Sequence, residues 1–514
     1  MSQNETERVL HADLRHVVYA LSDALDLVGV DDIAHGKRVG IMAAECAQAQ
    51  GWSRAEAAFL FDLGLLHDVG VSSTVTHGHL VAEFDWESSQ CHCAVGYELL
   101  RDFAPLVNMA LPIRYHHTHW ESLCERGIEP DVARWANLIY LVDRVDSMAA
   151  PYYANGTLLM QTQAIRERIA ERAGSYFSPA LVDIFLEASR PEAFWLNLEA
   201  RGIQAYLADM LAQSQPYVAT VNELKQLATI FSRIVDAKSP FTAEHSLGVA
   251  RLARFLAEKL GVSAENCDKI EIAGLLHDIG KLRVPDEILD KPAKLDECER
   301  KVMNTHSFET YQILRMIPGF EEIAPWAAYH HEEPGGSGYP FRLAAENLQL
   351  EARILRVADI FQAMAQDRPY RPGLPAVEVL AFMEELVRKG SIDADIVAVA
   401  ANDMSGAMAA ARPGRENGGR RPRRSARHGG GRRLRGGSPP RPRNSSSYTH
   451  RAGRRRHRRD GRNWWLRGKS RVAPNPWRAA RRRNDPCRGF RGSAGRAVRG
   501  TGRAAGPSAC TGRA

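Results

Sequence analysis

The segment GLLHDIGK, residues 274–281, places an imidazole, a carboxylate and an amine at the end of an apolar helical pattern. Apolar residues recur at helical spacing before and within it, which predicts a core-facing helix that ends at Gly280. Other histidines and aspartates lie in or beside further apolar helical patterns: His245, His306, His330, His331 and Asp359. Together with His277 and Asp278 they would be costly to bury without a partner, and a metal centre would supply one.

Imidazole and carboxylate groups are the ligands that borderline first-row metal ions prefer. Seven candidate ligands exceed a single tetrahedral site, so the pattern predicts two ions rather than one. Asp278 has two carboxylate oxygens and is the natural bridge between them. A hydroxide held between two ions can attack a phosphorus atom at neutral pH, because bound water has a lowered pKa.

The order of these motifs resembles that of the HD superfamily of metal-dependent phosphohydrolases, and of its HD-GYP branch in particular. The narrower resemblance rests on HHEEPGGSGYP at 330–340, ARILRVADIF at 352–361 and DRPYR at 367–371. It extends over residues from about 235 to about 402. The resemblance implies an all-α fold of helical bundles and the hydrolysis of a cyclic dinucleotide, with cyclic di-GMP as the first expectation.

The resemblance also assigns roles to residues of this chain. The implied ligands of two divalent ions, Fe or Mn, are His245, His277, Asp278, His306, His330, His331 and Asp359. Lys281, Arg368 and Arg371 are the implied phosphate contacts, and Asp278 and Lys281 are the implied catalytic residues.

A loop of three residues carries the remaining implied substrate contacts, namely Gly338, Tyr339 and Pro340. It would shape the dinucleotide pocket, and in this family it is also a docking surface for diguanylate cyclases. A plain tight turn is the alternative interpretation of the same residues.

Three positions depart from the family pattern. Gly335 stands where an Asp usually precedes the Gly-Tyr-Pro run, and Gln362 stands where a second Asp usually follows the metal-binding one; neither is an expected ligand. Phe241 replaces a Glu that holds a third metal in some members, so two ions are expected. A catalytically weak binding or scaffold module is therefore one alternative, and an HD phosphohydrolase acting on another nucleotide such as cyclic GMP-AMP is another.

The same series of motifs occurs once before. Its members are His35, His67, Asp68, His92, His116, His117 and Asp143. The first histidine precedes the His-Asp pair by 32 residues in both series, and the lone histidine precedes the doublet by 24 in both. The spacing predicts two tandem HD domains, and hence a metal in the N-terminal one.

The two copies differ in every expected substrate contact. Val71 stands in the place of Lys281, and the first copy has neither a Gly-Tyr-Pro loop nor the paired arginines. This copy resembles the N-terminal HD domain that precedes HD-GYP domains in some tandem proteins. We therefore expect it to bind metal and to act as a regulatory or structural partner.

Charge is distributed unevenly along the 514 residues. From residue 411 onward the chain has 32 Lys and Arg against three acidic residues, whereas the part before it is acidic. Such a tail, with almost no aliphatic periodicity, is predicted to be disordered. Its bias toward residues with GC-rich codons favours a frameshifted or non-native extension over a nucleic-acid-binding arm or a solvated spacer.

The expected domains are an N-terminal HD-like domain at 1–215, a connecting helix at 216–235, the HD-GYP domain at 236–410 and the tail at 411–514. The expected partners are the cyclic dinucleotide, a diguanylate cyclase at the Gly-Tyr-Pro loop and a second copy of the chain, with nucleic acid only if the tail is native. The eight cysteines show no CxxC spacing, and no apolar run approaches 18 residues. These features predict a reduced, cytoplasmic protein without a membrane span.

Overall fold

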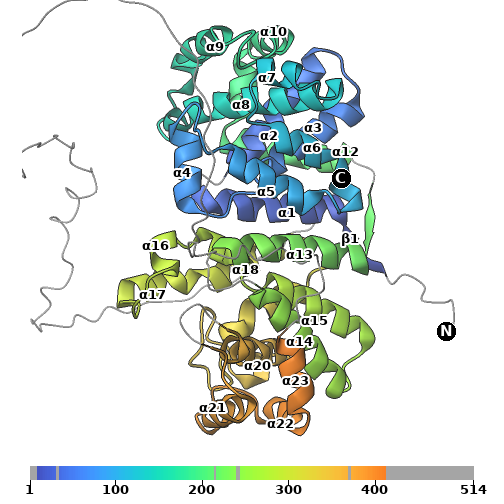
Figure 1. Ribbon diagram of the computed structural model, residues 1–514, viewed down its shortest axis with the longest axis vertical. Helices are drawn as coiled ribbons and strands as arrows, with labels where there is room; N and C mark the ends of the chain where they lie inside the picture. Colours follow the sequence, from blue (N-terminus) through green and yellow to red (C-terminus); the bar gives the residue numbers. More distant parts are fainter. Residues whose placement is uncertain (1–8, 30–33, 214–215, 239–243, 368–371, 413–514) are drawn as a thin grey trace, which may run out of the picture. The chain divides into compact units, whose positions relative to one another are not determined.

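The computed structural model describes residues 9–29, 34–213, 216–238, 244–367 and 372–412. Within these ranges the regular structure is helical apart from two short strands, which confirms the all-α fold class (Figure 1). In the described part of the chain, no helix is both long enough and apolar enough to cross a membrane. The tail predicted at 411–514 falls almost wholly outside these ranges.

We call the elements before residue 216 the first copy. They are β1 Val9–Asp13, α1 Leu14–Asp26, η1 Leu27–Gly29, α2 His35–Ala49, α3 Arg54–Leu66, α4 Thr74–Ala82, α5 Gln90–Leu100, η2 Ala104–Leu106, α6 Val107–Tyr115, α7 Trp120–Glu125, α8 Pro130–Tyr153, η3 Leu158–Met160, α9 Thr162–Ala170, α10 Pro179–Ala188, α11 Glu192–Leu196 and α12 Ala200–Gln213.

We call the elements after residue 216 the second copy. They are β2 Val218–Thr220, α13 Val221–Lys238, α14 His245–Lys259, α15 Ala264–Leu276, η4 Ile279–Arg283, α16 Asp286–Leu289, α17 Glu297–Met303, α18 Thr305–Leu314, α19 Ile323–Ala328, η5 Tyr329–His331, η6 Ala345–Asn347, α20 Leu350–Ala365, α21 Ala376–Arg388, α22 Ala394–Asn402 and α23 Met404–Ala411.

The helix in front of each His-Asp pair begins with a serine cap. Ser53 caps α3 and Ser263 caps α15, each by accepting a hydrogen bond from a backbone N–H three residues later. The sequence predicted that the second of these helices ends at Gly280, but α15 ends at Leu276 and the 3-10 turn η4 covers Gly280. The earlier end releases Asp278 from the helical path, so its carboxylate can face histidines of other helices.

Glycines allow close packing of two helix pairs, α2 with α3 and α14 with α15. In each pair, the first helix begins at the first histidine of the copy and the second helix leads into the His-Asp pair. A Cβ atom on Gly64 of α3 would lie 2.4 Å from the Cα of Gly40 in α2. A Cβ atom on Gly274 of α15 would lie 2.8 Å from the Cα of Ala250 in α14. This close approach brings the first histidine of each copy beside its His-Asp pair.

Helix α13, which covers most of the segment expected to connect the two copies, belongs by its contacts to the second copy. Its buried residues include Leu224, Phe231 and Ile234, and it packs against α15, α14 and η4. Strand β2 before it pairs antiparallel with β1 at the start of the first copy. The amphipathic pattern of α13 is therefore explained by core packing.

A buried ion pair joins the segments that follow the two His-Asp pairs. The Lys238 ammonium at the end of α13 lies 3.1 Å from Asp286 Oδ1 and donates to the Ser72 carbonyl oxygen at 3.2 Å. The Ser73 hydroxyl donates to Asp286 Oδ2 at 2.7 Å. The loop before α4 and the start of α16 are thus connected by side-chain contacts.

Candidate metal centres

Three side chains from three helices form the first ligand group of the second copy. His245 begins α14, His277 follows the end of α15, and Asp359 lies in α20. One ligand atom from each lies within 4.8 Å of the other two, and His245 Nε2 is 3.3 Å from Asp359 Oδ1. This spacing is suited to the coordination of one ion.

A second group lies beside it and consists of histidines alone. His306 comes from α18, and His330 and His331 come from η5. The Nε2 atoms of His306 and His330 are 3.4 Å apart. Burial lowers the pKa of His306 to about 4 and that of His331 to about 3, so both rings are neutral and able to donate a lone pair to a metal.

The Asp278 carboxylate lies between the two groups, with one oxygen toward each. Its Oδ2 atom is 3.2 Å from His277 Nε2 and 3.8 Å from His245 Nε2. Its Oδ1 atom is 3.5 Å from His306 Nε2 and 3.8 Å from His330 Nε2. This geometry would suit a carboxylate that bridges two ions, and the bridging role of Asp278 stays a prediction.

Backbone carbonyls set the orientation of three of these rings. The Nδ1 atoms of His277 and His306 lie 2.7 Å from the carbonyl oxygens three residues earlier in the chain. His330 Nδ1 lies 2.6 Å from the carbonyl oxygen of Ala327, which is also three residues earlier. A carbonyl oxygen can only accept, so Nδ1 carries the proton in each ring. Nε2 is therefore the nitrogen that faces the centre, where a ligand atom is needed.

Buried polar atoms without partners show that the residues of both copies fit a cation. Among the described residues, no hydrogen-bond partner is found for Nε2 of His67 and His277 or for Oδ1 of Asp68 and Asp278. Leaving such atoms unpaired in a protein interior is unfavourable. Metal ions would pair all four, since each is a lone-pair donor.

The Lys281 side chain reaches the Asp278 carboxylate, and its contact with a substrate phosphate stays a prediction. Its Nζ atom lies 2.5 Å from Asp278 Oδ2. Burial alone would raise the pKa of Asp278, but the charges of His277 and Lys281 hold it well below the usual range. Arg368 and Arg371, the other expected phosphate contacts, lie outside the described residues, as does Phe241.

The Gly-Tyr-Pro loop is attached to the second ligand group. The Tyr339 ring stacks on the His331 ring, with centroids 4.8 Å apart. The carboxylate of buried Glu332 accepts three backbone N–H bonds, from residues 341, 342 and 343, at 2.7, 3.2 and 2.9 Å. A Cβ on Gly338 would lie 2.4 Å from the Cα of Glu332, which explains the glycine. Sequence reasoning missed Glu332; an acid directly after the histidine doublet was the available signal.

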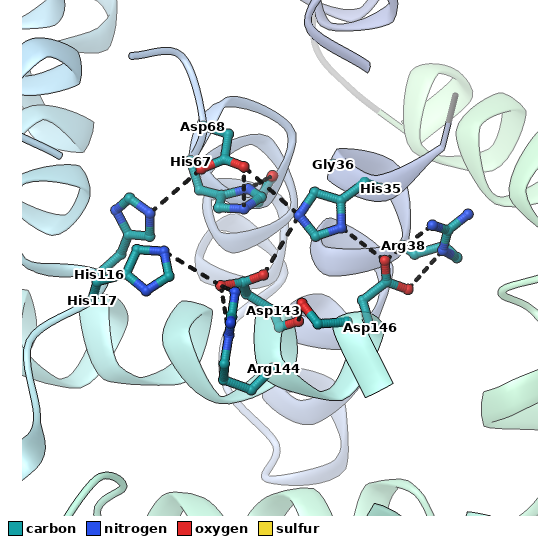
Figure 2. Close-up of polar contacts among 12 residues, drawn as sticks. His35, Gly36, Arg38, His67, Asp68, His116, His117, Asp143, Arg144 and Asp146 are labelled. Carbon is teal, nitrogen blue, oxygen red and sulfur yellow. Dashed lines mark hydrogen bonds and ion pairs between the residues drawn. The ribbon is translucent and has the colours of Figure 1, made fainter. Parts of the chain in front are cut away.

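The first copy repeats both groups. His35, His67 and Asp143 form one, and Asp68, His92, His116 and His117 form the other, so all seven predicted ligands come together. Figure 2 shows all of these side chains except His92, and they converge from α2, α8 and the loops after α3 and α6.

Asp68 lies between the ligand histidines of the first copy, as Asp278 does in the second. Its Oδ1 atom is 3.2 Å from His92 Nε2 and 3.7 Å from His116 Nε2. Its Oδ2 atom is 3.6 Å from His67 Nε2 and 3.9 Å from His35 Nε2. The repeated spacing in the sequence thus corresponds to repeated geometry.

The first copy differs from the second in what surrounds the ligands. The Arg144 guanidinium, also buried, donates to Asp143 Oδ2 at 2.8 Å (Figure 2). Val71, buried in the place of Lys281, supplies no charge. The cavity beside His35 and His67, which His77 also lines, has a volume of about 10 Å³, close to the volume that holds one water.

A family model described as an HD domain matches residues 229–396, from α13 to the start of α22. The 3'3'-cGAMP-specific phosphodiesterase 1 of Vibrio cholerae is 39% identical over 393 residues, which are 75% of this chain and 90% of that protein. The cyclic di-GMP phosphodiesterase response regulator RpfG of Xanthomonas campestris is 35% identical over 179 residues, which are 34% of this chain and 47% of that protein.

A solved structure also resembles the fold described here. It is a crystal structure of a cyclic GMP-AMP specific phosphodiesterase of Vibrio cholerae, with a TM-score of 0.52 and 26% identity, covering 77% of this chain and 98% of that one. A match of 393 residues is longer than either copy alone, so it extends over parts of both copies. The chain therefore belongs to the HD-GYP family of cyclic dinucleotide phosphodiesterases, within the HD superfamily of metal-dependent phosphohydrolases.

Proposed function

We propose that the second copy hydrolyses a phosphodiester bond of 3'3'-cyclic GMP-AMP. The observation that carries the choice of substrate is the extent of the matches. The relative named for this dinucleotide matches over 393 residues, whereas the cyclic di-GMP phosphodiesterase matches over 179. Cyclic di-GMP, the first expectation from the sequence, is retained as the second candidate because RpfG bears that name.

The residues of the second copy have distinct proposed roles. Divalent ions held by the two ligand groups would polarise phosphate oxygens and acidify a water. Asp278 would hold both groups in register, because its two oxygens face different histidines. Lys281 would neutralise charge that develops on the phosphate as the P–O bond breaks. Tyr339, stacked on His331, would form one wall of the dinucleotide site.

We propose that the first copy binds metal without hydrolysing the dinucleotide. Its ligand set is complete, but Val71 offers no cation in the place of Lys281, and the first copy has no Gly-Tyr-Pro loop. Metal would satisfy the buried Nε2 of His67 and Oδ1 of Asp68, so the expected consequence is metal-linked folding.

The substrate is tested with the purified full chain, loaded anaerobically with Mn²⁺ or Fe²⁺. Each dinucleotide is offered separately and the products are separated by chromatography. We expect kcat/KM for 3'3'-cyclic GMP-AMP to exceed that for cyclic di-GMP at least about tenfold, a difference of about 1.4 kcal/mol in transition-state binding. Faster cleavage of cyclic di-GMP would contradict the substrate, and cleavage of neither would contradict the proposed reaction.

A further inference from the structure

The first histidine of each copy is held at Nδ1 by a side chain from the helix that carries the last aspartate. In the first copy His35 Nδ1 lies 2.8 Å from Asp146 Oδ2. In the second copy His245 Nδ1 lies 2.5 Å from Gln362 Oε1. Asp146 and Gln362 each follow the last aspartate of their copy by three residues, so they occupy equivalent positions.

The carboxylate of Asp146 is fixed by several donors (Figure 2). Arg38 donates from Nε to Oδ1 at 2.6 Å and from Nη2 to Oδ2 at 3.0 Å. The Tyr153 hydroxyl donates to Oδ1 at 2.7 Å, and the Arg38 guanidinium lies 4.2 Å from the centre of the Tyr153 ring. Asp146 is completely buried, so solvent does not compete for its oxygens.

The amide of Gln362 is fixed less firmly. Its Nε2 donates to the Ala411 carbonyl oxygen at the end of α23, at 3.4 Å. Gly248 occupies the position equivalent to Arg38, and a Cβ there would lie 2.7 Å from both Gln362 Nε2 and the Ala411 oxygen. The end of α23 thus packs where the first copy has a guanidinium, and a carbonyl oxygen there requires a donor, which an amide supplies and a carboxylate does not.

The two arrangements should affect a metal ligand differently. A carboxylate that accepts from the outer nitrogen of an imidazole makes the inner nitrogen a stronger ligand, and hydrogen bonds to charged groups are about twice as strong as neutral ones. His35 has such a carboxylate, itself fixed by two other side chains. His245 has a neutral amide, fixed through one long hydrogen bond to another helix.

We propose that the two centres hold metal with unequal strength, that the ion at His245, His277 and Asp359 is the more labile, and that Gln362 is the positioning residue behind this difference. This inference rests on the metal binding of the proposed function but not on its substrate. An exchangeable ion in the catalytic copy would make activity depend on metal supply, while the first copy keeps its metal.

The test follows metal release from the full chain loaded with Mn²⁺. Bound metal per chain is measured by mass spectrometry of the element after equilibration with increasing chelator. We expect two steps, and we expect the step at lower chelator concentration to be missing when His277 and Asp278 are replaced by Ala. A single step, or a labile step that is lost instead with His67 and Asp68, would overturn the proposal.

Two substitutions of Gln362 separate positioning from general stability. Gln362→Met removes both hydrogen bonds and should move the labile step to at least about tenfold lower chelator concentration. Gln362→Glu places a carboxylate behind His245 Nδ1, as in the first copy, and should move the labile step to higher chelator concentration, although its second oxygen would face the Ala411 carbonyl and lower the melting temperature. Equal metal loss in both variants, or no loss in Gln362→Met, would contradict the role assigned to Gln362.

Gln349→Met is the control, because the Gln349 side chain accepts from Trp326 Nε1 in the same copy, and among the described residues no hydrogen bond joins it to a proposed ligand. Its labile step should coincide with that of the wild type, and a shift as large as that of Gln362→Met would overturn the assignment. Release in two steps from a chain that cleaves no cyclic dinucleotide would uphold the inference and contradict the proposed reaction alone. Cleavage with release in one step would do the reverse.

Discussion

The fold orients most of the candidate histidine ligands by a hydrogen bond at one ring nitrogen, which leaves the other nitrogen toward the centre. Backbone carbonyls take the Nδ1–H of His67, His116, His277, His306 and His330, so Nε2 is the atom left toward the centre. Lys281 and Glu332 then distinguish the second copy, one by charge near the bridging carboxylate and the other by holding the Gly-Tyr-Pro loop.

Replacing Lys281 with Ala should leave metal in place and slow the reaction. Lys281 pairs with Asp278 but is not a lone-pair donor to either ligand group, so metal content per chain should stay at the wild-type value. Removing a cation that stabilises the transition state should lower kcat by about 100-fold. Lys281→Arg, which retains the charge, should lose less, and an unchanged kcat in Lys281→Ala would exclude the proposed role.

Glu332→Gln should disturb the loop without emptying the centre. One oxygen of Glu332 would become an NH₂ group that faces backbone N–H donors of residues 341–343. The resulting unpaired groups should cost about 1–3 kcal/mol of unfolding free energy. KM for the dinucleotide should rise more than metal content falls, as measured by steady-state kinetics beside metal analysis. Unchanged KM would show that the loop is not a substrate wall.

At the scale of single residues, the sequence predicts which side chains are candidate ligands. It does not predict the hydrogen bonds that orient these side chains. The histidines and aspartates could be found because the order of the motifs is repeated with similar spacing. The hydrogen bonds of Glu332, Asp146 and Gln362 could not be predicted, since their partners are backbone atoms or side chains in other segments of the chain. Which partner they meet depends on the tertiary path.

Secondary-structure elements bring the ligands together through one close helix pair in each copy. The pairs α2–α3 and α14–α15 touch at glycines, and the bridging aspartates follow directly where α3 and α15 end. The apolar spacing of the sequence predicts these helices. It does not predict where α15 stops, because the position of Asp278 is favoured by histidines on α14, α18 and η5.

Gly274→Ala should separate α14 from α15. The added methyl group would meet Ala250 Cα at 2.8 Å, and overpacking of this kind costs about 1–3 kcal/mol. We expect a lower melting temperature together with less metal in the second copy, because His245 would move away from His277. Gly78→Ala in α4 is the control, since no atom lies within 4 Å of the added group and helix propensity favours Ala. Equal melting temperatures for the two variants would contradict the packing argument.

At the scale of the whole molecule, the two copies are joined by contacts between the segments that follow their His-Asp pairs. Lys238, with no exposed side-chain surface, pairs with Asp286, and Asp286 accepts from Ser73. No pattern in the sequence indicates this contact, because Ser73, Lys238 and Asp286 lie far apart along the chain. The tandem arrangement itself was predictable, since the motif series recurs.

Lys238→Met should destabilise the chain by about 3 kcal/mol, because it leaves Asp286 beside Ser73 without its cation in a mostly buried place. Denaturant unfolding of the full chain measures the change. Lys301→Met, which removes an exposed pair with Glu297, should have little effect. A double replacement of Lys238 and Asp286 should lose less than the sum of the single ones, and strict additivity would show that the pair is not coupled.

The central claim is that one copy hydrolyses and the other only holds metal. It is tested by measuring bound metal and 3'3'-cyclic GMP-AMP cleavage on the same preparations of two variants, one with His277 and Asp278 replaced by Ala and one with His67 and Asp68 replaced by Ala. We expect both variants to lose metal, only the first to lose all turnover, and the second to have a lower melting temperature. Cleavage that survives in the first variant, or disappears in the second while its other centre keeps metal, would contradict the claim.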